Sequence, residues 1–120
     1  MTLEDFQQRL RVFADERDWH QFHTPKNLAM ALSAEAGELL ELFQWLTPEQ
    51  SAQITDSDTG TKVHRELADV LAYLLRLADV LEVDLLTALD EKMTLNASKY
   101  PVDLAKGTAR KYDQLGQEEQ

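Results

Sequence analysis

The segment Glu35-Ala-Gly-Glu38 places two carboxylates three residues apart inside an apolar, helix-forming stretch, and Glu66-Leu-Ala-Asp69 repeats this arrangement later in the chain. Residues three apart on a helix are neighbours, so two such helices that face each other gather all four carboxylates around one point. Acidic groups crowded in a poorly hydrated site stay ionised only when a cation neutralises them. All the candidate ligands are oxygens, which favours Mg²⁺ or Mn²⁺ over zinc or copper. The sequence therefore predicts a magnesium site between two helices.

The first segment belongs to a predicted helix that runs from Pro25 to Leu46 behind the N-cap residue Thr24. At about 100° per residue, the leucines of this helix form one apolar stripe. Glu35 falls in the middle of the stripe and Glu38 at its edge. A carboxylate on an apolar face must be paired, protonated or bound to metal. The alternative to a metal site is a set of surface salt bridges together with one buried, hydrogen-bonded glutamate.

Apolar periodicity predicts three further helices. They cover approximately residues 3–19, 62–81 and 85–99, with Thr2 and Asp84 as the caps of the first and last. The helix over 62–81 is apolar on more sides than one packing partner requires, which is typical of a central helix or of an oligomer interface. Its predicted core stripe consists of Val63, Leu67, Val70, Leu74, Leu77 and Leu81. The polar stretch 49–61 is expected to form a mobile loop.

These helices predict an all-α protein. Residues 1–101 are expected to form the helical domain, and residues 102–120 a C-terminal arm with a flexible tail. A chain of 120 residues, of which 43% are hydrophobic, suffices for one such core and is too short for two.

The composition narrows the function and the compartment. A formal net charge of −10 argues against binding to a nucleic-acid polymer, which requires clustered Lys and Arg. The sequence contains no cysteine, no leader-like N-terminal segment and no apolar run long enough to span a bilayer. We therefore expect a cytoplasmic protein that does not associate with membranes.

Several residues outside the acidic pairs have two interpretations. Lys92 and Asn96 lie one turn apart at the margin of a predicted buried face, where they contact a phosphate or sugar, or are a snorkelling lysine and a satisfied amide. Trp19, Trp45 and Tyr73 are either core aromatics or surfaces on which a nucleobase stacks. The sequence has no glycine-rich phosphate loop and no serine-type catalytic motif, so phosphate chemistry here would depend on metal.

Three longer runs together resemble a known family. They are the run from Glu35 to Trp45, the segment from Glu66 to Val70 and the run from Lys92 to Pro101. These runs resemble the MazG-like all-α nucleotide pyrophosphohydrolases, and most closely the dCTP pyrophosphatase branch. The segment from Arg17 to His23 and the arm from Lys106 to Tyr112 are similar to the same branch.

The resemblance implies a four-helix-bundle-type MazG-like fold that forms a homo-dimer or homo-tetramer. It also implies hydrolysis of a nucleoside triphosphate, dCTP or a modified dCTP above all, to the monophosphate and pyrophosphate. Such an activity cleanses the nucleotide pool. The catalytic and metal-binding residues that the resemblance implies are Glu35, Glu38, Glu66 and Asp69. The implied substrate-binding residues are Trp19, His23, Trp45, Tyr73, Lys92, Asn96, Lys111 and Tyr112, the last two in an arm that closes over the site.

Two other interpretations fit the same residues. One is a pyrophosphohydrolase that acts on dUTP or on a broad range of nucleoside triphosphates. The other is a non-catalytic helical dimerisation module, in which the apolar helix over 62–81 is the functional element and the buried glutamate has only a structural role.

Overall fold

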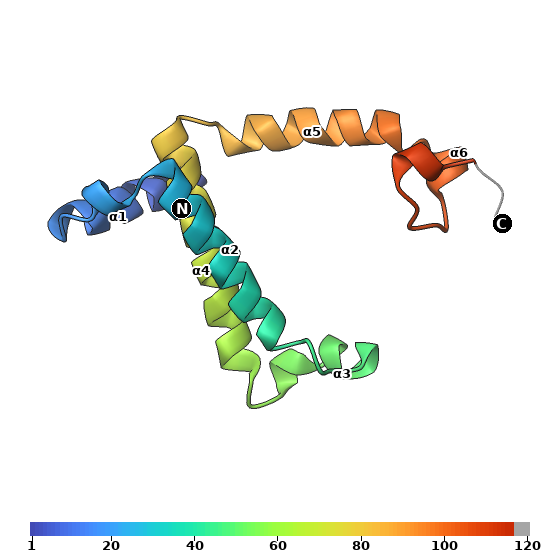
Figure 1. Ribbon diagram of the computed structural model, residues 1–120, viewed down its shortest axis with the longest axis horizontal. Coiled ribbons are helices and arrows are strands. Elements are labelled where there is room, and N and C mark those ends of the chain that lie inside the picture. The colour runs from blue at the N-terminus through green and yellow to red at the C-terminus, as the bar shows by residue number, and fades with distance from the viewer. Residues whose placement is uncertain (117–120) are drawn as a thin grey trace. The chain divides into compact units, whose positions relative to one another are not determined.

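The computed structural model describes residues 1–116, and every regular element within them is an α-helix or a short 3₁₀ helix, written η (Figure 1). The elements are α1 (Leu3–Glu16), η1 (His20–Phe22), α2 (Pro25–Glu41), α3 (Pro48–Ala52), η2 (Ile54–Asp56), α4 (Gly60–Leu81), α5 (Leu85–Lys99), α6 (Val102–Ala105) and η3 (Tyr112–Gln114). This architecture confirms the predicted all-α fold. None of the described helices is both long enough and apolar enough to cross a lipid bilayer.

Internal contacts divide the chain into two compact units, Met1–Val83 and a second unit that begins at Asp84. The first unit contains α1 to α4, and the second contains α5 and α6. The sequence predicted a boundary between residues 101 and 102, with a helical domain before it and an arm after it. This boundary stays a prediction. The expected flexible end of the tail falls at residues 117–120, which lie outside the described part of the chain.

Side-chain caps set where the helices begin. The Thr2 hydroxyl accepts a hydrogen bond from the Asp5 N–H at 3.1 Å, and the Asp5 carboxylate accepts one in return from the Thr2 N–H at 2.8 Å. Thr24 caps α2 and Asp84 caps α5 through the same type of side-chain hydrogen bond. Each cap satisfies a backbone donor that the helix itself leaves without a partner. The predicted N-caps are therefore confirmed.

The first unit is built on the antiparallel pair α2 and α4, against which α1 also packs (Figure 1). Gln7 on α1 donates from Nε2 to the Leu75 carbonyl at 3.1 Å, and Arg11 donates to both carboxylate oxygens of Asp79 at 3.0 and 2.7 Å. These contacts fix α1 beside the C-terminal half of α4. The buried apolar core consists of Ala14, Leu28, Ile54, Val63, Leu75 and Ala78.

The helix predicted over 25–46 is shorter in the structure, because α2 ends at Glu41. The backbone N–H groups of residues 42–46 bond chiefly to carbonyls three residues back, so the chain tightens into turns there. Pro48 restricts only the residue before it and the preceding turn, so the proline accounts for a stop near residue 46 and not for the earlier end at Glu41. The stretch 49–61, expected to be a loop, contains helical turns from α3 and η2.

The predicted core stripe of α4 is only partly buried. Val63 is buried, whereas Leu67 and Leu81 are each 51% exposed. Leu75 and Ala78, outside the predicted stripe, are buried instead, because α1 packs on the side of α4 that carries Leu75. The exposed leucines form an apolar strip on α4. Its members are Leu67, Leu71, Leu74 and Leu81.

The second unit has little core of its own. Leu89 and Met93 on α5 are 56% and 62% exposed, so the described residues of this unit leave the apolar face of the helix uncovered. At its far end, the Tyr100 and Tyr112 rings meet edge to face with their centroids 6.3 Å apart. The Lys99 ammonium lies 4.6 Å from the centroid of the Tyr112 ring. These contacts hold the start of the arm against the end of α5.

Gly60 is required where η2 meets α4, because an added Cβ would overlap the backbone carbonyl oxygen of Thr55. We expect Gly60→Ala to lower the free energy of unfolding by about 1–3 kcal/mol. Gly37→Ala is the matched control, since a Cβ at Gly37 meets no atom within 4 Å, and alanine inside a helix gains about 0.5–1 kcal/mol. Urea denaturation measures both effects, and equal stability of the two variants would contradict this account.

Candidate functional site

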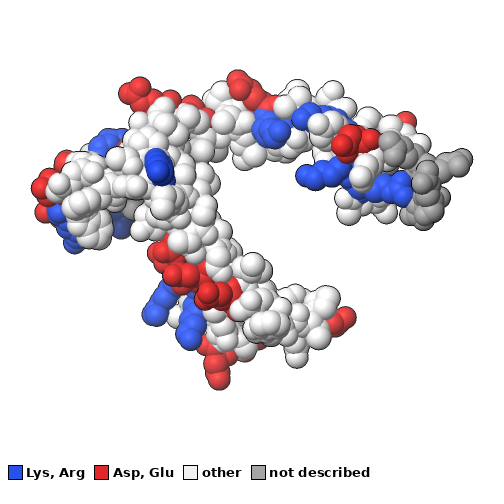
Figure 2. Space-filling view, in the orientation of Figure 1, with Lys and Arg blue, Asp and Glu red and all other residues white. Residues whose placement is uncertain are grey.

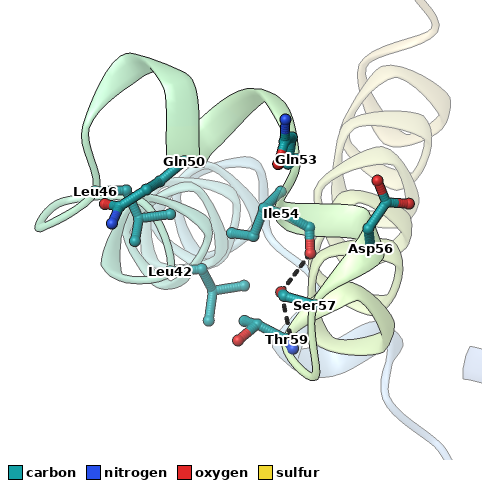
Figure 3. A pocket seen from close by; sticks show the side chains of 8 residues that line it. All are labelled: Leu42, Leu46, Gln50, Gln53, Ile54, Asp56, Ser57 and Thr59. Atoms are coloured by element: carbon teal, nitrogen blue, oxygen red, sulfur yellow. Dashed lines mark hydrogen bonds between the residues drawn. The ribbon is translucent and has the colours of Figure 1, made fainter.

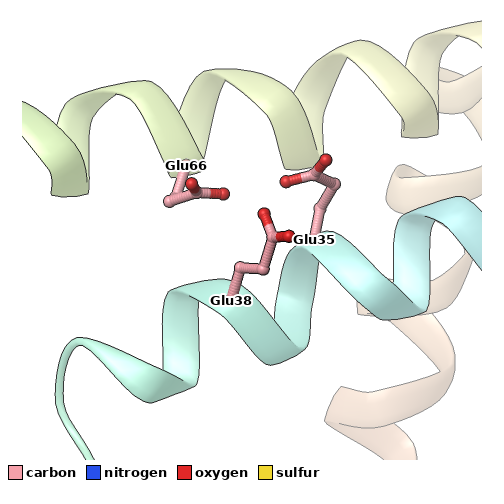
Figure 4. A group of neighbouring side chains, drawn as sticks. All are labelled: Glu35, Glu38 and Glu66. Carbon is pink, nitrogen blue, oxygen red and sulfur yellow. The ribbon is translucent and has the colours of Figure 1, made fainter.

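The two acidic segments face each other across the α2–α4 pair. One carboxylate oxygen from each of Glu35, Glu38 and Glu66 lies within 4.8 Å of the other two (Figure 4). Glu35 and Glu66 are half-buried, whereas Glu38 is exposed. We call these three residues the carboxylate cluster. It brings together three of the four predicted metal ligands, two from α2 and one from α4.

Two atoms of the carboxylate cluster, Oε2 of Glu35 and Oε2 of Glu66, are buried without a hydrogen-bond partner. Within the first unit, which is described throughout, no lysine, arginine or histidine forms an ion pair with any of the three carboxylates. The three carboxylates are therefore not held by surface salt bridges, and the hydrogen-bonded glutamate of the alternative interpretation stays open. Buried carboxylate oxygens without a donor are strongly disfavoured unless a cation or a proton is supplied. Oxygen-only donors of this kind fit a hard divalent cation.

Without a cation, a proton relieves the crowding. A hydrogen bond with the Glu66 carboxyl, followed by burial and the nearby Glu38 and Asp69 carboxylates, raises the pKa of Glu35 to about 7. A hydrogen bond between Glu35 and Glu66 exists only while one of the two carboxyl groups holds a proton. When both groups are ionised, their buried oxygens have no donor. A cation that binds here must therefore displace a proton at neutral pH.

Asp69, the fourth predicted ligand, is exposed on α4 and lies outside the carboxylate cluster. Its charge acts on Glu35, and its side chain also lines a pocket of about 160 Å³. We call this cavity the aromatic pocket. Its lining residues are Leu10, Phe13, Trp19, His23, Asp69, Ala72, Tyr73 and Arg76. Asp69 thus borders both the cluster and the pocket.

The end of α1 positions Trp19 in the aromatic pocket. Asp18 adopts a left-handed conformation with φ of 54°, which aspartate tolerates better than most residues. The Trp19 N–H then bonds to the Ala14 carbonyl at 2.9 Å, and the Asp18 N–H to the Asp15 carbonyl at 3.1 Å, as in a Schellman motif. This turn carries the Trp19 ring back onto Phe13, with the centroids 5.6 Å apart in an edge-to-face contact.

The structure brings Trp19, His23 and Tyr73 together in the aromatic pocket, as the resemblance implied. Trp45 is 86% exposed in the turns after α2 and does not line the aromatic pocket. The four remaining residues belong to the second unit, so their roles stay predictions. They are Lys92, Asn96, Lys111 and Tyr112.

Sequence reasoning missed Arg76, which is buried in the wall of the aromatic pocket. A signal for it was present. Asp69, Tyr73 and Arg76 follow one another by four and three residues, so they continue a single strip along α4. A lone arginine inside an apolar helix is also rarely buried without partners.

A second, more open pocket of about 450 Å³ lies where the end of α2 meets α3 and η2 (Figure 3). Its floor is apolar, and its rim carries amide and hydroxyl groups. The lining residues are Leu42, Leu46, Gln50, Gln53, Ile54, Asp56, Ser57 and Thr59. None of them belongs to the carboxylate cluster or to the aromatic pocket.

The α2–α4 pair carries an acidic area. Figure 2 shows carboxylate side chains gathered over the lower part of these two helices, with Lys and Arg side chains beside them, and the formal net charge of the chain is −10. Such a surface repels a phosphate ester unless a bound cation reverses the local charge. The acidic charge and the unpartnered buried oxygens therefore both indicate that the site needs a bound cation.

Comparison with known proteins identifies the class. Residues 30–115 match the MazG-like family, and the chain belongs to that family. A pyrophosphatase from Archaeoglobus fulgidus, known from a crystal structure, is 44% identical and superimposes with a TM-score of 0.77, over 82% of this chain and 91% of that one.

Two curated relatives carry a more specific name. The dCTP pyrophosphatase 1 proteins of Homo sapiens and Mus musculus are each 47% identical to this chain over 115 residues. Each alignment covers 95% of this chain and 68% of the relative. The family resemblance inferred from the sequence is therefore confirmed.

The raised pKa of Glu35 makes stability depend on pH in the metal-free protein. Glu35 has a pKa of about 7 in the folded chain, against 4.5 ordinarily, so the folded state binds this proton more tightly. Its contribution to stability is present below pH 4.5 and is lost as the pH rises from 4.5 to 7. We expect Glu35→Gln to flatten this part of the profile.

Urea denaturation in EDTA across this pH range measures the effect. Glu41→Gln is the control, because Glu41 is exposed on α2 and lies outside the carboxylate cluster. Parallel profiles for the wild type and Glu35→Gln would contradict the predicted proton on Glu35.

Proposed function

We propose that this protein is a Mg²⁺-dependent nucleoside triphosphate pyrophosphohydrolase that converts dCTP, or a modified dCTP, to dCMP and pyrophosphate and so cleanses the nucleotide pool. The observation that carries the proposal is the carboxylate cluster beside the aromatic pocket, with Asp69 at the border of both. A cation held by the cluster would lie within reach of the phosphates of a nucleotide whose base occupies the pocket. The human and mouse relatives named for dCTP favour that substrate.

Glu35, Glu38 and Glu66 would hold the cation, with Asp69 completing the set on the side of the pocket. When bound, Mg²⁺ supplies charge neutralisation at the triphosphate and activation of the attacking water. The chain's own contribution is to fix these carboxylates on two packed helices, so that little reorganisation is needed when the nucleotide binds. A carboxylate not fully engaged in metal binding would accept the proton of the attacking water.

The aromatic pocket would hold the base. Trp19 is 40% exposed, so part of its ring is available for stacking, and Tyr73 lies in the same wall as Asp69. Stacking on aromatic side chains is worth about 1–3 kcal/mol per base and tolerates any base. Selection of a pyrimidine therefore needs a polar contact in addition.

Four further proposed contacts belong to the second unit. Lys92, Asn96, Lys111 and Tyr112 remain the proposed nucleotide contacts of this unit, and the aromatic contact between Tyr112 and Tyr100 gives the arm a defined starting position. Trp45 remains a proposed base contact, because its ring is exposed and a base can stack on it.

We propose a cytoplasmic location, which the absence of cysteine supports. We also propose that the protein binds neither nucleic-acid polymers nor membranes, which the acidic charge supports.

A triphosphate panel tests the reaction. We expect the protein to release pyrophosphate from dCTP with Mg²⁺ present, faster than from dUTP or purine nucleotides, and to lose this activity in EDTA. Substitution of groups that only support metal ligands costs about 10–100-fold. We therefore expect Glu35→Gln and Glu66→Gln, each removing a ligand charge, to lower kcat/KM by at least about 100-fold.

Glu41→Gln is the matched control and should retain wild-type activity, because it removes an exposed charge from the same helix. Circular dichroism should show that all three variants keep their helices. Equal activity of Glu35→Gln and Glu41→Gln, or turnover that persists in EDTA, would contradict the proposal.

We propose that the protein is a homo-dimer or homo-tetramer. The apolar strip of α4 and the uncovered apolar face of α5 both need a covering surface, and a second copy of the chain supplies a matching one. Analytical ultracentrifugation should give the mass of a dimer or tetramer. Leu71→Lys, which places a charge in the strip, should shift that mass downward, and a monomeric wild type would contradict this expectation.

A further inference from the structure

Arg76 is buried, with 6% of its surface exposed, and it points toward two histidines. Its Nε donates to Nδ1 of His23 at 3.1 Å, and its Nη2 lies 2.5 Å from Nδ1 of His20. On its other side, Nη1 donates to Asp79 at 3.3 Å, and Asp79 is held in turn by Arg11. The histidines on one side and Asp79 on the other therefore fix the orientation of the guanidinium.

This arrangement determines where the His23 ring carries its proton. A guanidinium has only donors, so the Nδ1 atom that faces it must accept. The proton of a neutral His23 then lies on Nε2. Burial, and after it the positive charge of Arg76 and the proximity of His20, lower the pKa of His23, so the ring is neutral at physiological pH.

His20 follows the same rule. Its Nδ1 faces Arg76, and its Nε2 lies 2.6 Å from Asp15, where an Nε2–H donates to the carboxylate. His20 thus has a partner on both ring nitrogens. His23 does not, since Nε2 of this pocket-lining ring has no hydrogen-bond partner among the residues that the structure describes.

We propose that Arg76 is a positioning residue for base recognition: it fixes His23 as the Nε2–H tautomer, and this N–H donates to N3 of a cytosine in the aromatic pocket. The inference rests on the proposed function and deepens it. Cytosine presents acceptors at both O2 and N3, whereas N3 of uracil carries a proton. A ring held as a donor toward N3 therefore favours dCTP over dUTP, which stacking on Trp19 cannot do.

Arg76→Met tests the inference by keeping the length of the side chain and removing its donors. We expect KM for dCTP to rise about 3–10-fold, the scale of one hydrogen bond, with kcat nearly unchanged. The preference for dCTP over dUTP should fall by a similar factor. Arg11→Met is the matched control, because Arg11 also bonds to Asp79 but does not line the aromatic pocket.

Nitrogen NMR of the His23 ring in the wild-type protein supplies a readout that does not depend on turnover or on the folding of a variant. We expect a deprotonated Nδ1 and a protonated Nε2 without ligand, and a shift of the Nε2–H signal when deoxycytidine, which carries no phosphate, is added. In Arg76→Met the ring should become a mixture of tautomers. In Arg11→Met it should remain the Nε2–H form.

Two results would overturn the inference. One is a wild-type His23 with its proton on Nδ1. The other is an equal loss of dCTP affinity in Arg76→Met and Arg11→Met with the tautomer unchanged, which would show a purely structural role. A protein with the expected tautomer that does not hydrolyse dCTP would instead contradict the proposed function, so the two failures are distinguishable.

Discussion

Packing α2 against α4 removes one carboxylate oxygen of Glu35 and one of Glu66 from contact with water. Oε2 of Glu35 and Oε2 of Glu66 are buried without a partner, and no basic side chain of the first unit pairs with either residue. The helices can approach this closely only if a proton or a cation neutralises the charge between them. This requirement links the fold to its chemistry, because the contact that holds the first unit together also creates the site.

The neighbouring features follow from the same helix pair. The strip that begins with Glu66 continues along α4 through Asp69 and Tyr73 to Arg76, so the carboxylate cluster and the aromatic pocket share one helix. The turn after α1 brings Trp19 and His23 to the other wall of the pocket. Charge, stacking surface and a directed hydrogen-bond donor are therefore arranged along a short length of rigid structure.

Local rules were sufficient to predict much of this from the sequence. Caps, proline positions and apolar periodicity predicted the helices, and the position of Glu35 on an apolar stripe predicted the cluster. The early end of α2 and the burial of Leu75 were not predictable, because they depend on competition between turns and on which side of α4 the first helix packs. Arg76 was missed because its role depends on two histidines distant in sequence.

The most direct test of the central claim is an anomalous-difference map from crystals of the protein soaked in Mn²⁺. The account predicts a peak between α2 and α4, within about 2.0–2.3 Å of carboxylate oxygens from Glu35 and Glu66. A map with no peak there at saturating Mn²⁺, or with Glu35 and Glu66 separated and individually hydrogen-bonded, would contradict it.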